Sequence, residues 1–141
     1  AFITDLMWFV YLKRRDLLPE DRTLKYAEVL SRPDFENIVR HMIDCTIADM
    51  NSLEKKLFHL EKRFSLRVSQ PELMQEAHIA RNALVHNAGR VNRETAASSR
   101  WRVGDRVTLS VSDVHDFGIM LRGYTKEMCA KAEALCISPN A

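Results

Sequence analysis

The feature that most constrains the fold is a run of apolar residues, most of them three or four positions apart, between residues 35 and 64. The run consists of Phe35, Ile38, Val39, Met42, Met50, Leu53, Leu57, Leu60 and Phe64. This spacing places one apolar stripe along a helix, and the stripe must pack against other elements to be buried. A start signal precedes it, because Ser31 or Asp34 can accept backbone N–H groups and Pro33 suits a first helical turn. We therefore expect one long helix here, with a small kink near residues 46–49.

Three further long segments and one short segment show a helical pattern. They cover residues 3–16, 24–30, 71–87 and, after a cap at Ser110 or Ser112, the stretch up to residue 135. Ser69 and Glu72 have the spacing of a capping box, with Pro71 inside the first turn of the helix that follows. The chain has only four glycines and four prolines, which favours helices over many short strands.

The periodicity disappears between the last two long helices. Residues 88–106 are mostly small or polar, and a loop of this length in a small domain is often functional. The sequence RVTLSV that begins at Arg106 alternates apolar and polar residues, which indicates a short strand. The sequence thus predicts an all-α bundle of four to five helices, with a long polar loop before the last helix, in a single domain over 1–141.

The composition is that of an ordinary soluble globular protein, with 46% hydrophobic and 28% charged residues. The net charge is +2, so binding to nucleic acid would need a local cluster of cations. Three cysteines without a CxxC pair argue against a disulfide framework and favour reduced thiols in the cytoplasm. The apolar start, AFITDLMWFVYL, is too short to span a bilayer and lacks the basic region of a signal peptide. We interpret it as a buried or interface helix and expect no membrane association.

The candidate site is the stretch RNALVHNAGRVN. Arg81 is followed five residues later by His86, and Asn82 and Asn87 stand directly after them. Arginine offers a planar fork for two phosphate oxygens, and histidine exchanges a proton near neutral pH. Such groups can cleave RNA without a metal when the neighbouring 2′-OH attacks phosphorus, because that step needs a base, an acid and a cation. The alternative interpretation is that these side chains only cap the end of a helix and complement its dipole.

The spacing of these residues places them on different faces of a helix. Asn82 and His86 are four residues apart and share one face, on which His78 also lies. Arg81 and His86 are separated by about 140° around an ideal helix axis, so they do not stack directly. Contact would require the long arginine side chain to swing round, the helix end to loosen, or a second subunit to complete the site.

Other candidate sites are weaker. His41, His59, His78 and His115 form no HxxxH or HExxH pair, so we expect no metal site, and no Walker or GxGxxG pattern occurs. For His78 a solvated helix position is the simpler interpretation, and contact with a substrate is the alternative. For Trp101 we favour packing in the loop over stacking on a base.

The motif resembles the RxxxxH motif of the HEPN superfamily (higher eukaryotes and prokaryotes nucleotide-binding domain), in which a polar residue such as Asn82 typically follows the arginine. The segments DFENIVRHMIDC, HNAGRVN and GDRVTLSVSDV occur in an order similar to that of the RiboL-PSP-HEPN branch of prokaryotic single-domain proteins. The likeness spans roughly residues 33–135. It implies a HEPN-like helical bundle that usually forms a homodimer, with two motif helices facing each other across one composite cleft.

The resemblance also implies a metal-independent endoribonuclease for single-stranded RNA, often in toxin–antitoxin, phage-defence or RNA-processing systems, with an antitoxin protein as a further partner. Arg81 and His86 would be the catalytic pair, supported by Asn82, with no metal and no cofactor. Arginines and one asparagine after the motif are candidate RNA-binding residues, namely Asn87, Arg90 and Arg93, with Arg100, Arg102 and Arg106 further along the loop. Several HEPN proteins are not nucleases, so the alternative is a non-catalytic dimerisation or nucleotide/phosphate-binding module.

Overall fold

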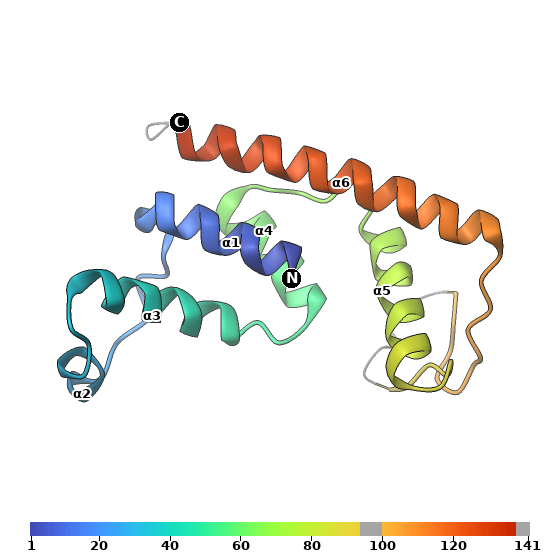
Figure 1. Ribbon diagram of the computed structural model, residues 1–141, viewed down its shortest axis with the longest axis horizontal. Helices are drawn as coiled ribbons and strands as arrows, with labels where there is room; N and C mark the ends of the chain where they lie inside the picture. The colour runs from blue at the N-terminus through green and yellow to red at the C-terminus, as the bar shows by residue number, and fades with distance from the viewer. Residues whose placement is uncertain (94–99, 138–141) are drawn as a thin grey trace. The chain divides into compact units, whose positions relative to one another are not determined.

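A computed structural model describes residues 1–93 and 100–137 of the chain, and these residues are almost entirely helical (Figure 1). They form helices α1 (Phe2–Lys13), α2 (Tyr26–Leu30), α3 (Phe35–Ala48), α4 (Leu53–Phe64), α5 (Pro71–His86) and α6 (Val111–Ile137), and the 3-10 helix η1 (Arg15–Leu17). No strand occurs in these ranges, which confirms the predicted all-α class. None of the described helices combines the length and the apolar character that crossing a bilayer demands.

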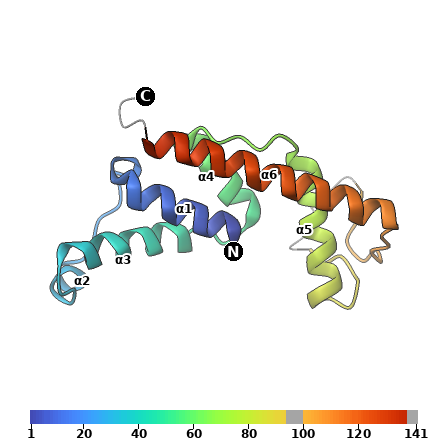
Figure 2. The ribbon, with the colours of Figure 1, turned by 45° about the horizontal axis from the view of Figure 1, so that its top comes forward.

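Contacts within the chain divide it into two compact units, one of residues 1–67 with 128–141 and the other of residues 68–127. In the first unit α1 lies beside α3 and contacts α4 (Figures 1 and 2). The buried residues of α1 are Leu6, Met7, Val10 and Tyr11. The apolar start of the chain is therefore a buried helix, as one of the two interpretations of the sequence held. The single domain over 1–141 stays a prediction.

The long helix expected over residues 35–64 is broken into two, so that part of the prediction is wrong. Helix α3 ends at Ala48, and α4 begins after Ser52, whose side chain accepts a hydrogen bond from the backbone N–H of Lys55 at 3.2 Å. Asparagine and serine compete with helical hydrogen bonds through their own side chains, so residues 51–52 favour a new start over continuation. The start of α3 is as predicted, because Asp34 accepts a hydrogen bond from the backbone N–H of Asn37 at 2.8 Å.

The other predicted caps have mixed outcomes. The N-cap of α5 is Gln70 without a side-chain hydrogen bond, so the capping box expected at Ser69 is not formed, although Pro71 does begin the helix. The cap of α6 is Ser110, whose Oγ accepts from the backbone N–H of Asp113 at 3.0 Å, while the Asp113 carboxylate accepts from the backbone N–H of Ser110 at 2.8 Å. This reciprocal pair fixes where the last helix begins.

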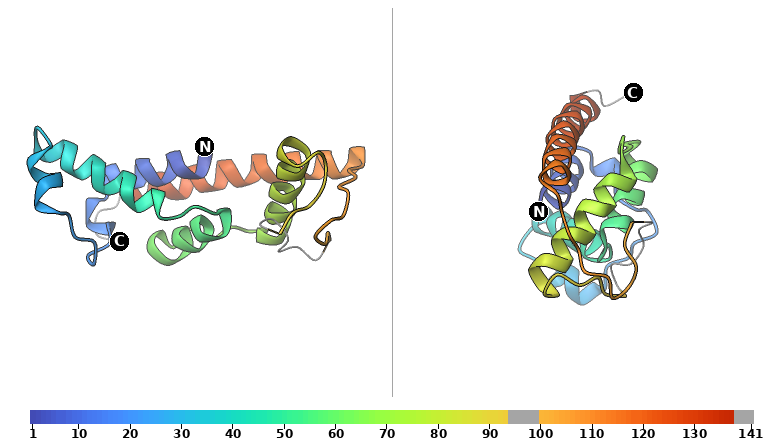
Figure 3. Two further views of the ribbon diagram at one scale, coloured as in Figure 1. Left: turned by 90° about the horizontal axis from the view of Figure 1, so that it is seen from below. Right: turned by 90° about the vertical axis from the view of Figure 1, so that its right-hand side faces the viewer.

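The second unit is built from α5, the following loop and the first part of α6, and Figure 3 shows the loop running beside α5. Its core contains side chains from all three parts, namely Ile79, Ala80, Ala83, Val91, Trp101, Val107 and Phe117. Backbone hydrogen bonds also hold the two ends of the loop together, including Val91 N–H to Asp105 O at 2.9 Å and Val107 N–H to Gly89 O at 2.8 Å. Residues 94–99 of the predicted loop lie outside the described residues.

The strand expected from residue 106 is wrong. Arg106 forms only an isolated antiparallel bridge with Arg90. The alternation itself reports burial correctly, since Val107 is buried, Leu109 half-buried, and Thr108 and Ser110 exposed. A strand does not develop because the pairing segment around residue 90 is short and Ser110 already caps α6.

Candidate functional site

Helix α5 has one buried apolar face, and the polar side chains of the motif lie outside that face. Ile79, Ala80 and Ala83 are almost completely buried against the loop and α6. Arg81 and His86 are exposed, and His78 and Asn82 are half-buried. Because the alanines are small, the loop packs closely on one side of the helix and leaves the polar side chains on the other.

The central contact of the site joins Arg81 and His86. The Nη1 atom of Arg81 lies 2.8 Å from Nε2 of His86, and both belong to the same chain. The sequence left three ways of joining these residues open. In the structure the first of them is found, because the long arginine side chain swings round to reach the histidine. Since α5 remains regular through His86, neither a loosened helix end nor a second subunit is needed for this contact.

Asn82 and His78 extend the contact into a network. The Nη1 atom of Arg81 also donates to Oδ1 of Asn82 at 3.0 Å, and Nδ2 of Asn82 lies 2.9 Å from Nε2 of His78. Asn82 and His78 are four residues apart, as the shared helical row predicts. The structure thus brings together the three predicted site residues Arg81, Asn82 and His86, and adds His78.

The helix end places His86 beside a sharp change of direction. His86 is the last residue of α5, and Asn87 caps it with a half-buried side chain. Ala88 and Gly89 then adopt positive φ angles of 51° and 80°, and the Gly89 N–H donates to Ala83 O at 2.8 Å. Glycine takes this conformation without strain, which explains its place directly after the motif.

The arginines after the motif fall into two groups. Arg90, Arg93, Arg102 and Arg106 are exposed. Arg90 donates to Gly104 O at 3.2 Å, which leaves most of its guanidinium toward solvent. No hydrogen bond or ion pair in the described ranges joins Asn87, Arg90 or Arg93 to Arg81 or His86. The structure therefore places these candidate RNA-binding residues near the end of α5 in sequence, without a hydrogen bond or ion pair to Arg81 or His86 among the described residues.

Arg100 belongs to the second group, because it pairs with carboxylates inside its own unit. Its guanidinium lies 2.8 Å from Asp113 and 3.6 Å from Glu76, and 4.8 Å from the ring centre of Trp101. Backbone hydrogen bonding at Ser110 and, next, the contact with Arg100 lower the pKa of Asp113. Trp101 is 6% exposed, which confirms that it packs. Arg100 is therefore not one of the cations that remain open to RNA.

The environment of Arg81 differs in that no carboxylate of a described residue pairs with it. An arginine only donates hydrogen bonds, so the Nε2 atom of His86 must present its lone pair to Arg81. Burial, and to a smaller extent the charge of Arg81, lowers the pKa of His78. The site thus combines an exposed guanidinium, a histidine that can accept a proton and a second histidine that favours its neutral form.

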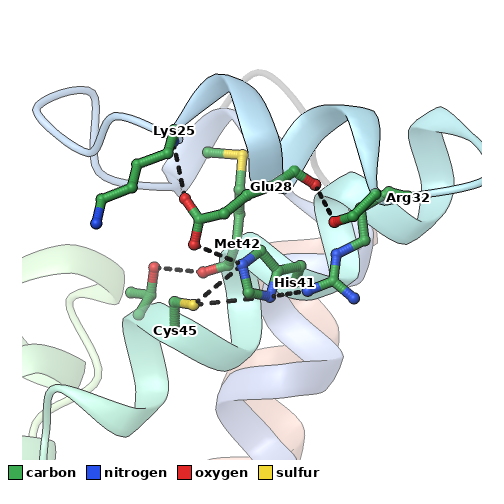
Figure 4. A network of polar contacts seen from close by, with 8 residues as sticks. Lys25, Glu28, Arg32, His41, Met42 and Cys45 are labelled. Carbon is green, nitrogen blue, oxygen red and sulfur yellow. Dashed lines mark hydrogen bonds and ion pairs between the residues drawn. The ribbon is translucent and has the colours of Figure 1, made fainter.

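A second arginine–histidine network lies in the other unit, between α2 and α3 (Figure 4). Arg32 lies 3.0 Å from Nδ1 of His41, and Glu28 lies 3.3 Å from Nε2 of the same ring. A backbone hydrogen bond from Lys25, followed by the contact with His41, lowers the pKa of Glu28. Both nitrogens of this imidazole are therefore occupied.

Cys45 also belongs to this cluster, but His41 is not placed to activate it. The Sγ atom lies 3.6 Å from Nε2 and 3.8 Å from Nδ1, so it contacts the ring between two nitrogens that already have partners (Figure 4). The interpretation of the sequence missed this cluster. The spacing of four between His41 and Cys45 was a usable signal, whereas Glu28 lies 13 residues before the histidine.

Neither a search for metal-binding clusters nor the comparison with known proteins assigns a function to the chain. Among the described residues, no group of three His, Cys, Asp or Glu side chains is arranged to hold a metal ion. No family model, curated protein or solved structure that was compared with the chain matches it. The resemblance to the HEPN superfamily is therefore carried by the residues of the motif and their order in the sequence.

Proposed function

We propose that this chain is a metal-independent endoribonuclease of the HEPN type, which cleaves single-stranded RNA at the Arg81–His86 pair. The observation that carries the proposal is the 2.8 Å contact between an exposed arginine and an exposed histidine, where no carboxylate of a described residue pairs with the arginine. A guanidinium without a carboxylate keeps donors for phosphate oxygens, and these charge-assisted hydrogen bonds are strong.

In the proposed reaction, Arg81 leaves His86 and donates to the non-bridging oxygens of the scissile phosphate. The 2′-OH of the preceding nucleotide then gives its proton to Nε2 of His86, and O2′ forms a bond to phosphorus. The P–O5′ bond breaks, and the departing O5′ takes a proton from a histidine in its protonated form. The products are a 2′,3′-cyclic phosphate and a 5′-OH end. Arg81 stabilises the charge that develops on the phosphate oxygens.

A homodimer would supply the second histidine, with Asn82 in support within each protomer. Leu84 and Val85, which lie between Arg81 and His86 in sequence, are 51% and 60% exposed. Apolar side chains on the same helix as the site support the pairing of two α5 helices, because they gain from being covered. Helix α1 is a less suitable surface, since four of its apolar residues, Leu6, Met7, Val10 and Tyr11, are already buried in the core of its own unit.

The exposed arginines after α5 are the proposed path for the RNA backbone. Arg90 and Arg93 follow the site directly, and Asn87 offers an amide at the helix end. Contacts of this kind hold phosphates without reading sequence. The cytoplasmic location enters the proposal through the cysteine pattern, which favours reduced thiols. The setting in toxin–antitoxin, phage-defence or RNA-processing systems, and an antitoxin protein as partner, enter through the resemblance alone.

The alternative is a module that holds a phosphate or nucleotide without cleaving it. The net charge of +2 favours it, because proteins dedicated to RNA usually carry a more basic surface. The contact of Arg81 with the lone pair of His86 also favours it, since this lone pair must be released before it can accept a proton.

The deciding experiment is an RNA cleavage assay in excess EDTA with the wild type, Arg81→Ala and His86→Ala, each checked for fold and oligomeric state. We expect cleavage by the wild type alone, with 2′,3′-cyclic phosphate ends. Both side chains are exposed, so both variants should keep their helical content. A folded wild type that leaves varied RNAs intact, or variants that cleave at the wild-type rate, would overturn the proposal.

A further inference from the structure

A chain of side-chain contacts on α5 continues beyond the proposed catalytic pair and ends at His78. It runs from His86 to Arg81 at 2.8 Å, from Arg81 to Asn82 at 3.0 Å, and from Asn82 to His78 at 2.9 Å. The direction of each hydrogen bond in this chain follows from the chemistry of its members. This chain of contacts, here called the relay, therefore connects His78 to His86, although eight positions separate them in sequence.

The arginine sets the direction because it has N–H groups and no acceptor. Asn82 must turn its carbonyl oxygen toward Arg81, which leaves its NH₂ group facing His78. An amide NH₂ group only donates, so Nε2 of His78 must accept, and the proton of this neutral ring must sit on Nδ1. The same reasoning places the lone pair of His86 on Nε2, the atom that the proposed reaction uses as a base.

We propose that His78 is a positioning residue of this site: its neutral imidazole holds the Asn82 amide so that the amide oxygen faces Arg81, which orients the guanidinium and thereby keeps the proton of His86 on Nδ1 until a phosphate draws Arg81 away. This inference rests on the proposed function where it concerns the rate of cleavage. Its structural part, the hydrogen-bond direction, stands independently of any activity. His78 is thus assigned a role other than contact with solvent or with the substrate.

Burial along the chain fits this role. His78 and Asn82 are half-buried, whereas Arg81 and His86 are exposed to an incoming phosphate. Water therefore has less access to the two residues that hold the orientation than to the two that are proposed to react. Burial also lowers the pKa of His78, which favours the neutral ring that can accept a hydrogen bond.

Three substitutions at position 78 separate the positioning role from a merely structural one. His78→Gln keeps an acceptor four residues before Asn82, His78→Ala removes it, and His78→Lys replaces it with a group that only donates. A lysine would favour the opposite amide orientation, with NH₂ toward Arg81, and the arginine could not accept that hydrogen bond. The predicted order of disruption is therefore lysine, alanine and glutamine, with glutamine closest to the wild type.

The experiment measures the proton position on each imidazole of the full chain by long-range ¹H–¹⁵N NMR, beside cleavage rates for the same samples. We expect both His78 and His86 of the wild type to carry the proton on Nδ1. In His78→Ala the tautomer of His86 becomes mixed and kcat/KM falls about tenfold, because a small displacement of a catalytic group costs rate. In His78→Gln we expect both the tautomer of His86 and kcat/KM to stay close to those of the wild type.

The outcomes keep the two proposals distinct. If the wild type does not cleave RNA, the proposed function fails, while the tautomer of His78 still decides whether the relay exists. A wild-type His78 with its proton on Nε2 overturns the relay, whatever the activity. A His78→Ala variant with an unchanged His86 tautomer and an unchanged rate also overturns it. Should that variant lose its helical circular dichroism, Asn82→Ala, which breaks the same relay from its other end, replaces it.

Discussion

Two arginine–histidine contacts in this molecule have similar lengths and different surroundings. Arg81 meets His86 at 2.8 Å on α5, and Arg32 meets His41 at 3.0 Å between α2 and α3. Glu28 binds the second nitrogen of His41, whereas the α5 network contains an amide, Asn82, in place of a carboxylate. A carboxylate uses up the hydrogen-bonding capacity of a histidine and neutralises a nearby cation, while an amide leaves the charge of the arginine available.

Exposure differs in the same direction. His86 is exposed, whereas the His41 side chain is 20% exposed and Cys45 packs against it, while the two arginines, Arg81 and Arg32, are both exposed. The α2–α3 network thus holds its imidazole between two helices of its unit, and the α5 network presents both its imidazole and its cation to solvent. The comparison teaches that an Arg–His contact alone does not identify a site for phosphate. The charge and the exposure around the contact decide between a structural and a functional role.

The largest expected difference concerns RNA cleavage. Arg81→Ala should lower kcat/KM about 10³-fold, since removing a single donor to a developing negative charge has effects of this size. Arg32→Ala is the matched control, because it removes the same side chain from the other contact, and it should stay within about twofold of the wild type. Cleavage rates with a fluorescent RNA in EDTA measure both. Equal losses of kcat/KM in Arg81→Ala and Arg32→Ala would mean that the difference between the two networks does not determine which one serves cleavage.

Asn82→Asp gives the α5 network the carboxylate that distinguishes the other one. The new charge should pair with Arg81 and repel the phosphate, so we expect kcat/KM to fall about 10²-fold, mostly through a higher KM. Asn51→Asp, which places the same substitution at an exposed position of the other unit, is the control for added charge alone. Wild-type activity in Asn82→Asp would show that a carboxylate beside Arg81 does not matter.

Substitutions in the α2–α3 network should affect stability more than substitutions in the α5 network, which is the reverse of their expected effects on cleavage. His41→Ala removes the contacts with Arg32, Glu28 and Cys45, and should lower the free energy of unfolding by about 1 kcal/mol. His86→Ala removes an exposed side chain and should change it by less than about 0.5 kcal/mol. Urea denaturation followed by circular dichroism measures both. A larger loss of stability in His86→Ala than in His41→Ala would mean that the α5 network, and not the α2–α3 network, has the structural role.

The smallest expected effect is a pH dependence of the α2–α3 network. Its hydrogen bonds lower the pKa of Glu28 in the folded chain below its ordinary value of 4.5. A lowered carboxyl pKa contributes stability that is present above the unfolded value and is lost as the pH falls through the folded value. The stability difference between the wild type and Glu28→Gln should therefore shrink as the pH falls below about 4.5. A difference that stays constant from pH 7 to pH 3 would show that the charge of Glu28 contributes nothing.

The sequence predicted the α5 site better than the α2–α3 site, for a physical reason. Asn82, His86 and His78 lie on one row of a single helix, so their spacing was sufficient to place them together. Glu28 and His41 come from different helices, and only the turn between α2 and α3 brings them into contact. Spacing also failed to show whether Arg81 reaches His86, because that depends on the conformation of a long side chain.

The errors in the predicted fold also arise where spacing along one segment does not determine the structure. The apolar stripe continues across residues 49–52, so periodicity alone predicted one helix, and the cap at Ser52 decided for two. The alternating residues after Arg106 have the burial expected of a strand, but a strand needs a partner of sufficient length, which the spacing of one segment cannot report. The all-α class was predictable because it depends on many residues at once.

The most direct test of the central claim is an NMR titration of the full chain with a single-stranded oligonucleotide in which every 2′-OH is replaced by hydrogen. This ligand carries the phosphates and cannot undergo the proposed reaction, so binding is measured without cleavage. We predict saturable shifts of the His86 ring and the Arg81 Nε–H signal, with the His41 ring unchanged. Shifts of both rings to the same extent, or of neither, would contradict the claim that the α5 contact is the one that handles phosphate.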